Sequence, residues 1–280
     1  MQSLNPPTLN VQTTLNACIS SIQDEGLKAS LTAISLDLIA AETSYITCGQ
    51  AMSLFSIPQT PDVSAVVSGD TMRRVYSGTF VKSVPTRPMY DAIKFAPAND
   101  ICPLCSQRTV STLDHYLSQS RHAALTIIPA NLVPACAECN KVKLNHQPAN
   151  ETDQSFHPYF DDCNDARWLM ADVIEEHPAA LFFRVQSPAN WSATKFARTA
   201  RHFNAFKLAS LYASHAAVEI TNIRYALGRI DERGGAMDIQ VFLSEQAESA
   251  RLVHQNSWRA ATYEALAQSN WFCDGGYAAD

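Results

Sequence analysis

Three short stretches in the middle of the chain decide its fold. Residues 102–105 read CPLC, residues 113–117 read LDHYL, and residues 131–140 read NLVPACAECN. The first and the last stretch each hold a Cys-x-x-Cys pair. The four cysteines are Cys102, Cys105, Cys136 and Cys139. Two such pairs can supply four thiolates to one tetrahedral Zn²⁺ with no position left open for water, so the sequence predicts a structural zinc site. Four buried cysteines without a metal are the alternative.

Composition limits the class of protein. The chain has 280 residues, of which 46% are hydrophobic and 17% charged, which is typical of a globular protein with a real core. Only nine glycines are present, so meanders with tight turns are disfavoured and helix should dominate. The formal net charge of −6 gives no overall attraction to polyanions, so any contact with nucleic acid would need a local patch.

The sequence predicts a cytoplasmic protein without a membrane span. No stretch approaches the roughly 20 consecutive apolar residues that a spanning helix needs. The first residues, 1–7, lack the basic region of a signal peptide. In a reducing compartment, paired cysteines indicate metal binding and not disulfides.

Four regions are expected along the chain, which we assign to an α+β, mostly helical fold class. The first is a helical region over residues 1–55, with a helical hairpin at 10–50, and the second is a linker or extended segment over 56–100, with a possible strand at 75–81. The third is a zinc-binding centre over residues 101–150. The fourth is a helical region over residues 151–280 that is expected to pack on this centre. Helices in the last region are expected at 166–176, 194–229, 238–254 and 258–271, with a break at Gly234-Gly235.

Between the cysteine pairs, the chain resembles the HNH endonucleases of the His-Me finger superfamily, in the subclass whose ββα-metal motif is clamped by four cysteines. The resemblance covers about residues 101–145. The matching positions are Asp114 and His115 for the family's Asp-His pair, Asn131 for its middle Asn, and Asn140 for its third position. Many relatives have His at that third position, and His146 could compete with Asn140 for the role.

The residues around these positions suit two strands followed by a helix. Residues 112–117 and 124–128 are rich in β-forming residues, and the polar stretch 118–122 separates them. A helix over 137–145 would then present Asn140 towards His115.

The resemblance implies a metal-dependent endonuclease that hydrolyses phosphodiester bonds of nucleic acid, with DNA as the expected substrate. His115 would act as general base, while Asn131 would hold the loop or orient this histidine. Asp114 and Asn140 would offer oxygen ligands to a catalytic Mg²⁺ or Mn²⁺. Stand-alone relatives with helical flanks look like effectors of bacterial antiviral defence, so by analogy a protein partner such as an ATPase is expected.

Basic side chains near the motif and in the C-terminal region are the candidates for contact with nucleic acid. They are Lys141, Lys143, Arg121, Lys195 and Arg198. Relatives often carry Pro-Lys where this chain has Ser118-Gln119, and Arg121 is expected to compensate.

At the helical period, Lys195, Arg198 and His202 project together on the side opposite Phe203. This face could be merely solvated, could follow a phosphate backbone, or could dock a partner protein.

Two hypotheses stay open at this level. The alternative to the nuclease is a zinc-knuckle adaptor that binds nucleic acid or a partner protein without cutting it. The complete set of candidate catalytic residues favours the enzyme, since an adaptor has no need of all four. The aromatic stretch 156–162, FHPYFDD, is expected to pack over the small ββα unit, and the alternative is that His157 or Asp161 joins the active site.

Overall fold

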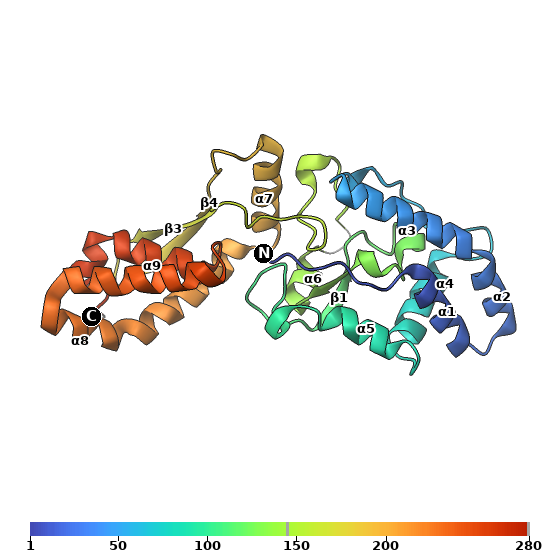
Figure 1. Cartoon of the computed structure of the whole chain (residues 1–280), viewed down its shortest axis with the longest axis horizontal. Helices are drawn as coiled ribbons and strands as arrows, with labels where there is room; N and C mark the ends of the chain where they lie inside the picture. The colour runs from blue at the N-terminus through green and yellow to red at the C-terminus, as the bar shows by residue number, and fades with distance from the viewer. Residues whose placement is uncertain (144–145, 279–280) are drawn as a thin grey trace. The chain divides into compact units, whose positions relative to one another are not determined.

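The computed structural model describes residues 1–143 and 146–278, and these form two compact units, Met1–Asp162 and Cys163–Asp280. Helices dominate both units, and each unit holds one small two-stranded antiparallel sheet (Figure 1). The α+β, mostly helical class expected from the sequence is therefore confirmed. The boundary between the units follows residue 162, so residues 151–162 belong with the cysteine-rich centre and not with the C-terminal region.

The first unit begins with three helices, α1 (Val11–Ser21), α2 (Glu25–Ala33) and α3 (Ser35–Gln50), in place of the expected hairpin. Capping side chains start the first two of them. Asn10 Oδ1 accepts a hydrogen bond from the main-chain N–H of Thr13, and Asp24 Oδ1 accepts one from Leu27. These bonds satisfy N–H groups that have no partner within the helix, which explains why a new helix starts after Asp24.

The segment 56–100, expected as a linker, is largely helical. It forms α4 (Gly69–Arg74), a π-helical turn (Val75–Phe80) and α5 (Arg87–Lys94). The possible strand at 75–81 is thus wrong. Val75 and Phe80 are both buried five residues apart, a spacing that puts them on one side of the wider π-helix and on opposite faces of a strand.

The centre of the first unit has the chain order strand, strand, helix. Strand β1 (Thr112–His115) pairs antiparallel with β2 (Leu132–Ala135), so that His115 lies opposite Leu132 and Thr112 opposite Ala135. Helix α6 (Ala137–Lys143) follows β2 and packs on β1.

The expected second strand at 124–128 is wrong, because Ala123–Leu125 forms a 3₁₀ turn there. The fully buried apolar run of β2 pairs with β1 instead. The last two residues of the helix expected over 137–145 lie outside the described residues.

The second unit holds strands β3 (Leu169–Ile174) and β4 (Ala180–Val185) and helices α7 (Ala193–Ala205), α8 (Leu208–Val253) and α9 (Trp258–Gln268). The helix expected at 166–176 is wrong, since these residues contribute β3. In β4, Leu181 and Phe183 are buried while Phe182 between them is exposed, which is the alternation of a strand with one covered face. Helices α8 and α9 cover that sheet.

The break expected at Gly234-Gly235 is present inside α8. Gly235 has φ 69° and ψ −161°, a combination that residues with a side chain rarely adopt. The glycine therefore divides α8 into two helical legs.

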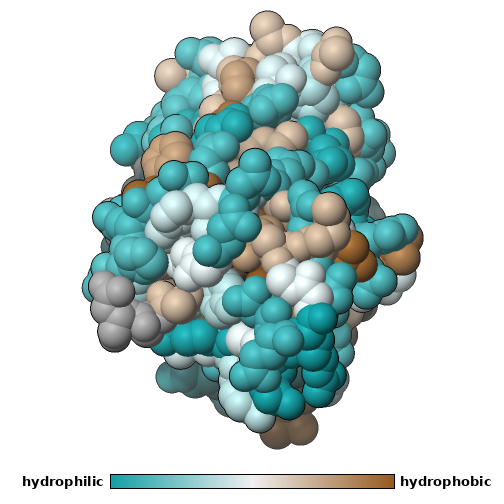
Figure 2. All heavy atoms as spheres, turned by 90° about the vertical axis from the view of Figure 1, so that its left-hand side faces the viewer, coloured by the Kyte–Doolittle hydropathy of each residue, from teal (hydrophilic) through white to brown (hydrophobic). Residues whose placement is uncertain are grey.

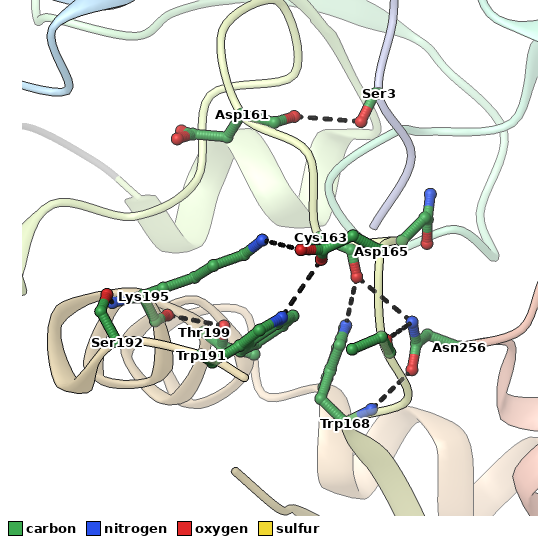
Figure 3. A network of polar contacts seen from close by, with 12 residues as sticks. Ser3, Asp161, Cys163, Asp165, Trp168, Trp191, Ser192, Lys195, Thr199 and Asn256 are labelled. Atoms are coloured by element: carbon green, nitrogen blue, oxygen red, sulfur yellow. Dashed lines mark hydrogen bonds and ion pairs between the residues drawn. The ribbon is translucent and has the colours of Figure 1, made fainter. Parts of the chain in front are cut away.

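A buried asparagine ties the start of the second unit to α9 (Figure 3). Asn256 Oδ1 accepts hydrogen bonds from the main-chain N–H groups of Trp168 (2.9 Å) and Leu169 (3.3 Å). Its Nδ2 donates to the carbonyls of Cys163 (3.2 Å) and Ala166 (2.9 Å). Both ends of the amide are thus satisfied, which makes Asn256 a structural residue.

No helix within the described residues combines the length and the apolar character needed to cross a membrane. In the face shown in Figure 2, hydrophobic side chains are scattered among hydrophilic ones. Single exposed apolar residues of this kind are normal on protein surfaces.

Candidate active site and metal centre

Four buried cysteines meet beside the small sheet of the first unit. The sulfurs of Cys102, Cys105, Cys136 and Cys139 all lie within 4.8 Å of one another. In a tetrahedral zinc site with Zn–S bonds of about 2.3 Å, neighbouring sulfurs would be about 3.8 Å apart. The separations therefore suit one tetrahedral ion.

The donor chemistry of this cluster also fits zinc. The main-chain N–H of Arg108 points at Cys105 Sγ (3.5 Å), and that of Cys139 points at Cys136 Sγ (3.4 Å). Main-chain N–H groups directed at sulfur favour the thiolate, which is the form that binds metal. The cluster can bind a zinc ion, and such an ion would join the loop before β1 to the junction of β2 and α6.

His115 ends β1 with its imidazole in a defined orientation. Its Nε2 lies 2.8 Å from the carbonyl oxygen of Thr126, and because a carbonyl can only accept, Nε2 carries the proton. In the neutral ring, Nδ1 is then an acceptor, and no residue in the described part of the chain hydrogen-bonds to it. The residue is 8% exposed, and burial together with the nearby Lys143 lowers its pKa to about 4. The imidazole is therefore a neutral base at pH 7.

Asn131 holds the loop that follows β1. Its Oδ1 accepts a hydrogen bond from the N–H of Leu117 (2.8 Å), and its Nδ2 donates to the carbonyls of Leu117 (3.0 Å) and Leu125 (3.1 Å). The side chain is fully buried. The loop segment that it fixes carries Thr126, the partner of His115. Of the two roles expected for Asn131, the structure shows the loop-holding one.

Asp114 is paired with a lysine from α6. Lys143 Nζ lies 2.8 Å from Asp114 Oδ2 and donates to the carbonyl of His115 (2.5 Å). Burial raises the pKa of Asp114, and the Lys143 ammonium partly opposes that rise. Lys143, expected to contact nucleic acid, is thus engaged inside the motif.

Asn140 and His146 were the alternatives for the third position of the motif. Asn140 is half-buried on α6, three residues before Lys143 and hence on the same face of the helix. Its side chain makes no hydrogen bond with the residues that the structure describes. His146 lies instead beside Asp153, with Nε2 3.2 Å from Oδ2. The geometry favours Asn140, whose amide is free to take a ligand.

The remaining basic candidates differ in exposure. Lys141 is exposed, and the exposed Arg121 donates to Gln59 Oε1 (2.9 Å). In the second unit, Lys195 forms an ion pair with Asp165 (2.7 Å) (Figure 3). These residues stay predictions as contacts to nucleic acid.

Arg198 and His202 on α7 are each 1% exposed, so these two side chains do not form a merely solvated face. A projection around the helix axis gives the angles between side chains but not which of them are covered. The interpretations of this face as a contact to a phosphate backbone or to a partner protein stay predictions.

The aromatic stretch after the motif has the expected packing role. Tyr159 donates from its hydroxyl to the carbonyl of Leu132 in β2 (2.8 Å). His157 is fully buried, its Nδ1 accepts from the N–H of Tyr159, and its Nε2 contacts the Tyr45 hydroxyl (3.0 Å). Because both ring nitrogens are engaged and Asp161 accepts from the main chain of His157, neither residue joins the candidate site.

Sequence reasoning missed two neighbours of His115. Thr126 contributes its main-chain carbonyl, and because every residue has one, the amino-acid type gives no sign of this role. Tyr76, whose ring centroid lies 4.5 Å from that of His115, comes from the segment that the sequence presented as a linker. Its signal in the sequence is the aromatic spacing of Tyr76 and Phe80, which suits a helical face as well as a core contact.

The chain is similar to the protein ea31 of Escherichia phage lambda. The two are 24% identical over 296 residues, which cover 98% of this chain and 100% of that protein. No family model matches the sequence, and no solved structure matches the chain.

Proposed function

We propose that this protein is a metal-dependent endonuclease of the HNH type that hydrolyses phosphodiester bonds of DNA. One observation supports this most strongly. His115 has its Nε2 held by the Thr126 carbonyl and its Nδ1 without a partner among the described residues, at the end of the first strand of a strand-strand-helix centre. This is what a general base requires, namely a neutral ring with one nitrogen fixed and the other able to accept a proton.

In the proposed reaction, His115 Nδ1 accepts a proton from a water molecule while the water oxygen bonds to phosphorus and the bond from phosphorus to the 3′ oxygen breaks. The leaving oxygen takes a proton from solvent. The positive charge that forms on the ring is stabilised by the Thr126 carbonyl at Nε2. The His115 pKa near 4 keeps the base unprotonated through the neutral range, so the group is ready to act without first losing a proton. Asn131 contributes by keeping the Thr126 loop in place.

Asp114 and Asn140 are the proposed oxygen ligands of a catalytic Mg²⁺ or Mn²⁺. A carboxylate and an amide oxygen are the donor types that such ions prefer, and the free amide of Asn140 fits that use. When bound, the ion would supply Lewis-acid stabilisation of the phosphate charge and of the leaving oxygen. Asp114 is paired with Lys143 in this structure. In the ligand role, Asp114 would give up that contact, and the Lys143 ammonium would be available to the substrate's phosphate.

The zinc cluster supports this centre without taking part in the reaction. Four sulfur ligands would fill a tetrahedral ion, so no position remains for water or phosphate. Exposed Lys141 and Arg121 would supply the local positive charge that an acidic chain needs for nucleic-acid binding. A role as an effector of antiviral defence, with an ATPase as partner, stays a prediction.

A cleavage assay tests the proposal directly. Purified zinc-loaded protein is incubated with plasmid, linear DNA, single-stranded DNA and RNA, with Mg²⁺ or Mn²⁺ and with EDTA. We expect metal-dependent cleavage of DNA, and His115→Ala should lower the single-turnover rate by about 10² to 10⁴. His146→Ala is the matched control and should cut as the wild type does.

Two outcomes would contradict the proposal. Cleavage by the His115 variant at the wild-type rate would exclude this residue as the base. Binding of nucleic acid or of a protein without cleavage under any of these conditions would favour the zinc-knuckle adaptor instead.

A further inference from the structure

A tyrosine from outside the motif packs against the proposed base. Tyr76 lies in the π-helical turn Val75–Phe80, and its ring meets that of His115 edge to face, with centroids 4.5 Å apart and an interplanar angle of 67°. Such aromatic pairs prefer this arrangement over face-to-face stacking. The contact links residues 39 positions apart in the chain.

A second layer of aromatic rings supports Tyr76. The Phe80 ring lies 5.8 Å from the Tyr76 ring, and the Tyr90 ring lies 6.1 Å from that of Phe80. Phe80 is fully buried, so this row is anchored in the core. The π-helical hydrogen bond from the N–H of Val81 to the carbonyl of Tyr76 (3.0 Å) fixes the backbone that carries the ring. Single π-helical turns of this kind occur frequently at functional sites.

The ring and the hydroxyl of Tyr76 have different surroundings. The ring contacts His115, whereas the hydroxyl makes no hydrogen bond within residues 1–143 and 146–278. The half-buried side chain therefore shields the imidazole with its apolar part.

We propose that Tyr76 is a positioning residue for His115. Its ring holds the imidazole against rotation while the Thr126 carbonyl fixes Nε2, and it excludes water from one side of the base. The catalytic consequence rests on the proposed function, but the contact itself does not.

The first test measures the exchange of the His115 Nε2 proton with water by NMR in the full chain at pH 7. His115→Gln identifies the His115 signal among the eight histidines. We expect wild type and Tyr76→Phe to exchange this proton alike, because both keep the ring. Tyr76→Ala should exchange it at least about tenfold faster, since the imidazole then turns away from the Thr126 carbonyl more often and water reaches it. Tyr225→Ala, at an exposed tyrosine of α8, is the control and should change nothing.

The second test follows cleavage kinetics. Tyr76→Ala should lower kcat by up to about tenfold with KM little changed. Tyr76→Phe should retain the wild-type kcat and KM. Zinc content and circular dichroism verify the fold of each variant, and Tyr76→Leu replaces Tyr76→Ala if the smaller side chain prevents folding.

The outcomes separate this inference from the proposed function. A His115 Nε2 proton that exchanges as in the wild type after loss of the ring would overturn the positioning role. A change as large in Tyr76→Phe as in Tyr76→Ala would also overturn it, because the hydroxyl would then be responsible. The NMR readout needs no nuclease activity, so a chain that cuts nothing fails the proposed function while the contact is still tested.

Discussion

Replacing Asn131 by Ala should destabilise the first unit strongly, because the side chain satisfies three buried main-chain groups. These are the N–H and carbonyl of Leu117 and the carbonyl of Leu125. Each buried group left without a partner costs about 1–3 kcal/mol. Water entering the space of the lost amide would recover part of this, so we expect a total loss of about 3–5 kcal/mol. That is a large share of a typical domain stability of about 5–15 kcal/mol.

The assay must distinguish the two units, since a chain with two compact units need not unfold in one step. All four tryptophans, Trp168, Trp191, Trp258 and Trp271, lie in the second unit. Tryptophan fluorescence in urea therefore reports on that unit, and release of zinc to a coloured chelator reports on the first. Asn131→Ala should release zinc at a much lower urea concentration, while its fluorescence transition stays at the wild-type midpoint.

Asn140→Ala is the matched control for this experiment. Its half-buried side chain has no hydrogen bond in the described part of the chain, so its stability should stay within about 0.5 kcal/mol of the wild type. Its cleavage should need more Mg²⁺, because a proposed ligand is lost. The reasoning fails if Asn131→Ala and Asn140→Ala release zinc at the same urea concentration as the wild type.

The same geometry yields predictions for the cysteine cluster, for His115 and for Lys143. Cys102→Ser should abolish tight zinc binding and lower solubility, and elemental analysis that finds no zinc in the freshly purified wild type would refute the metal site. The acidic limb of kcat/KM should lie near pH 4 and not near 6.5, as the His115 pKa requires. In the unfolded chain, His115 binds a proton near pH 6.5, so its contribution to the free energy of unfolding is complete above pH 6.5 and is lost as the pH falls to 4. Urea denaturation of wild type and of His115→Gln at several pH values would measure this difference. Lys143→Met should strengthen Mn²⁺ binding by about tenfold in an electron paramagnetic resonance titration, since Asp114 loses its competing cation. Unchanged Mn²⁺ affinity would mean that Asp114 is not a ligand.

Local sequence determined the four-cysteine cluster of this protein. The spacing within each Cys-x-x-Cys pair brings two sulfurs to one knuckle, whatever the rest of the chain does. Strand β1 and the start of α6 were likewise predictable from neighbouring residues. Gly235 predicted the break in α8, because few other residues tolerate the backbone angles found there. Asp114, His115 and Asn131 were candidate site residues because their order between the two cysteine pairs resembles that of the HNH endonucleases.

Only the tertiary structure decided which partners these residues meet. Short apolar runs fit a strand or a helix equally well, so β3 and the pairing partner of β1 depended on what each run could pack against. The periodicity of α7 was correct, but the covered side of the helix was settled by its neighbours, which buried Arg198. The Thr126 carbonyl, Lys143 and Tyr76 reach the site through contacts between distant segments. Such contacts form because folding must bury apolar surface and satisfy buried polar groups throughout a unit at the same time. They therefore depend on the whole unit and cannot be predicted from one stretch of sequence.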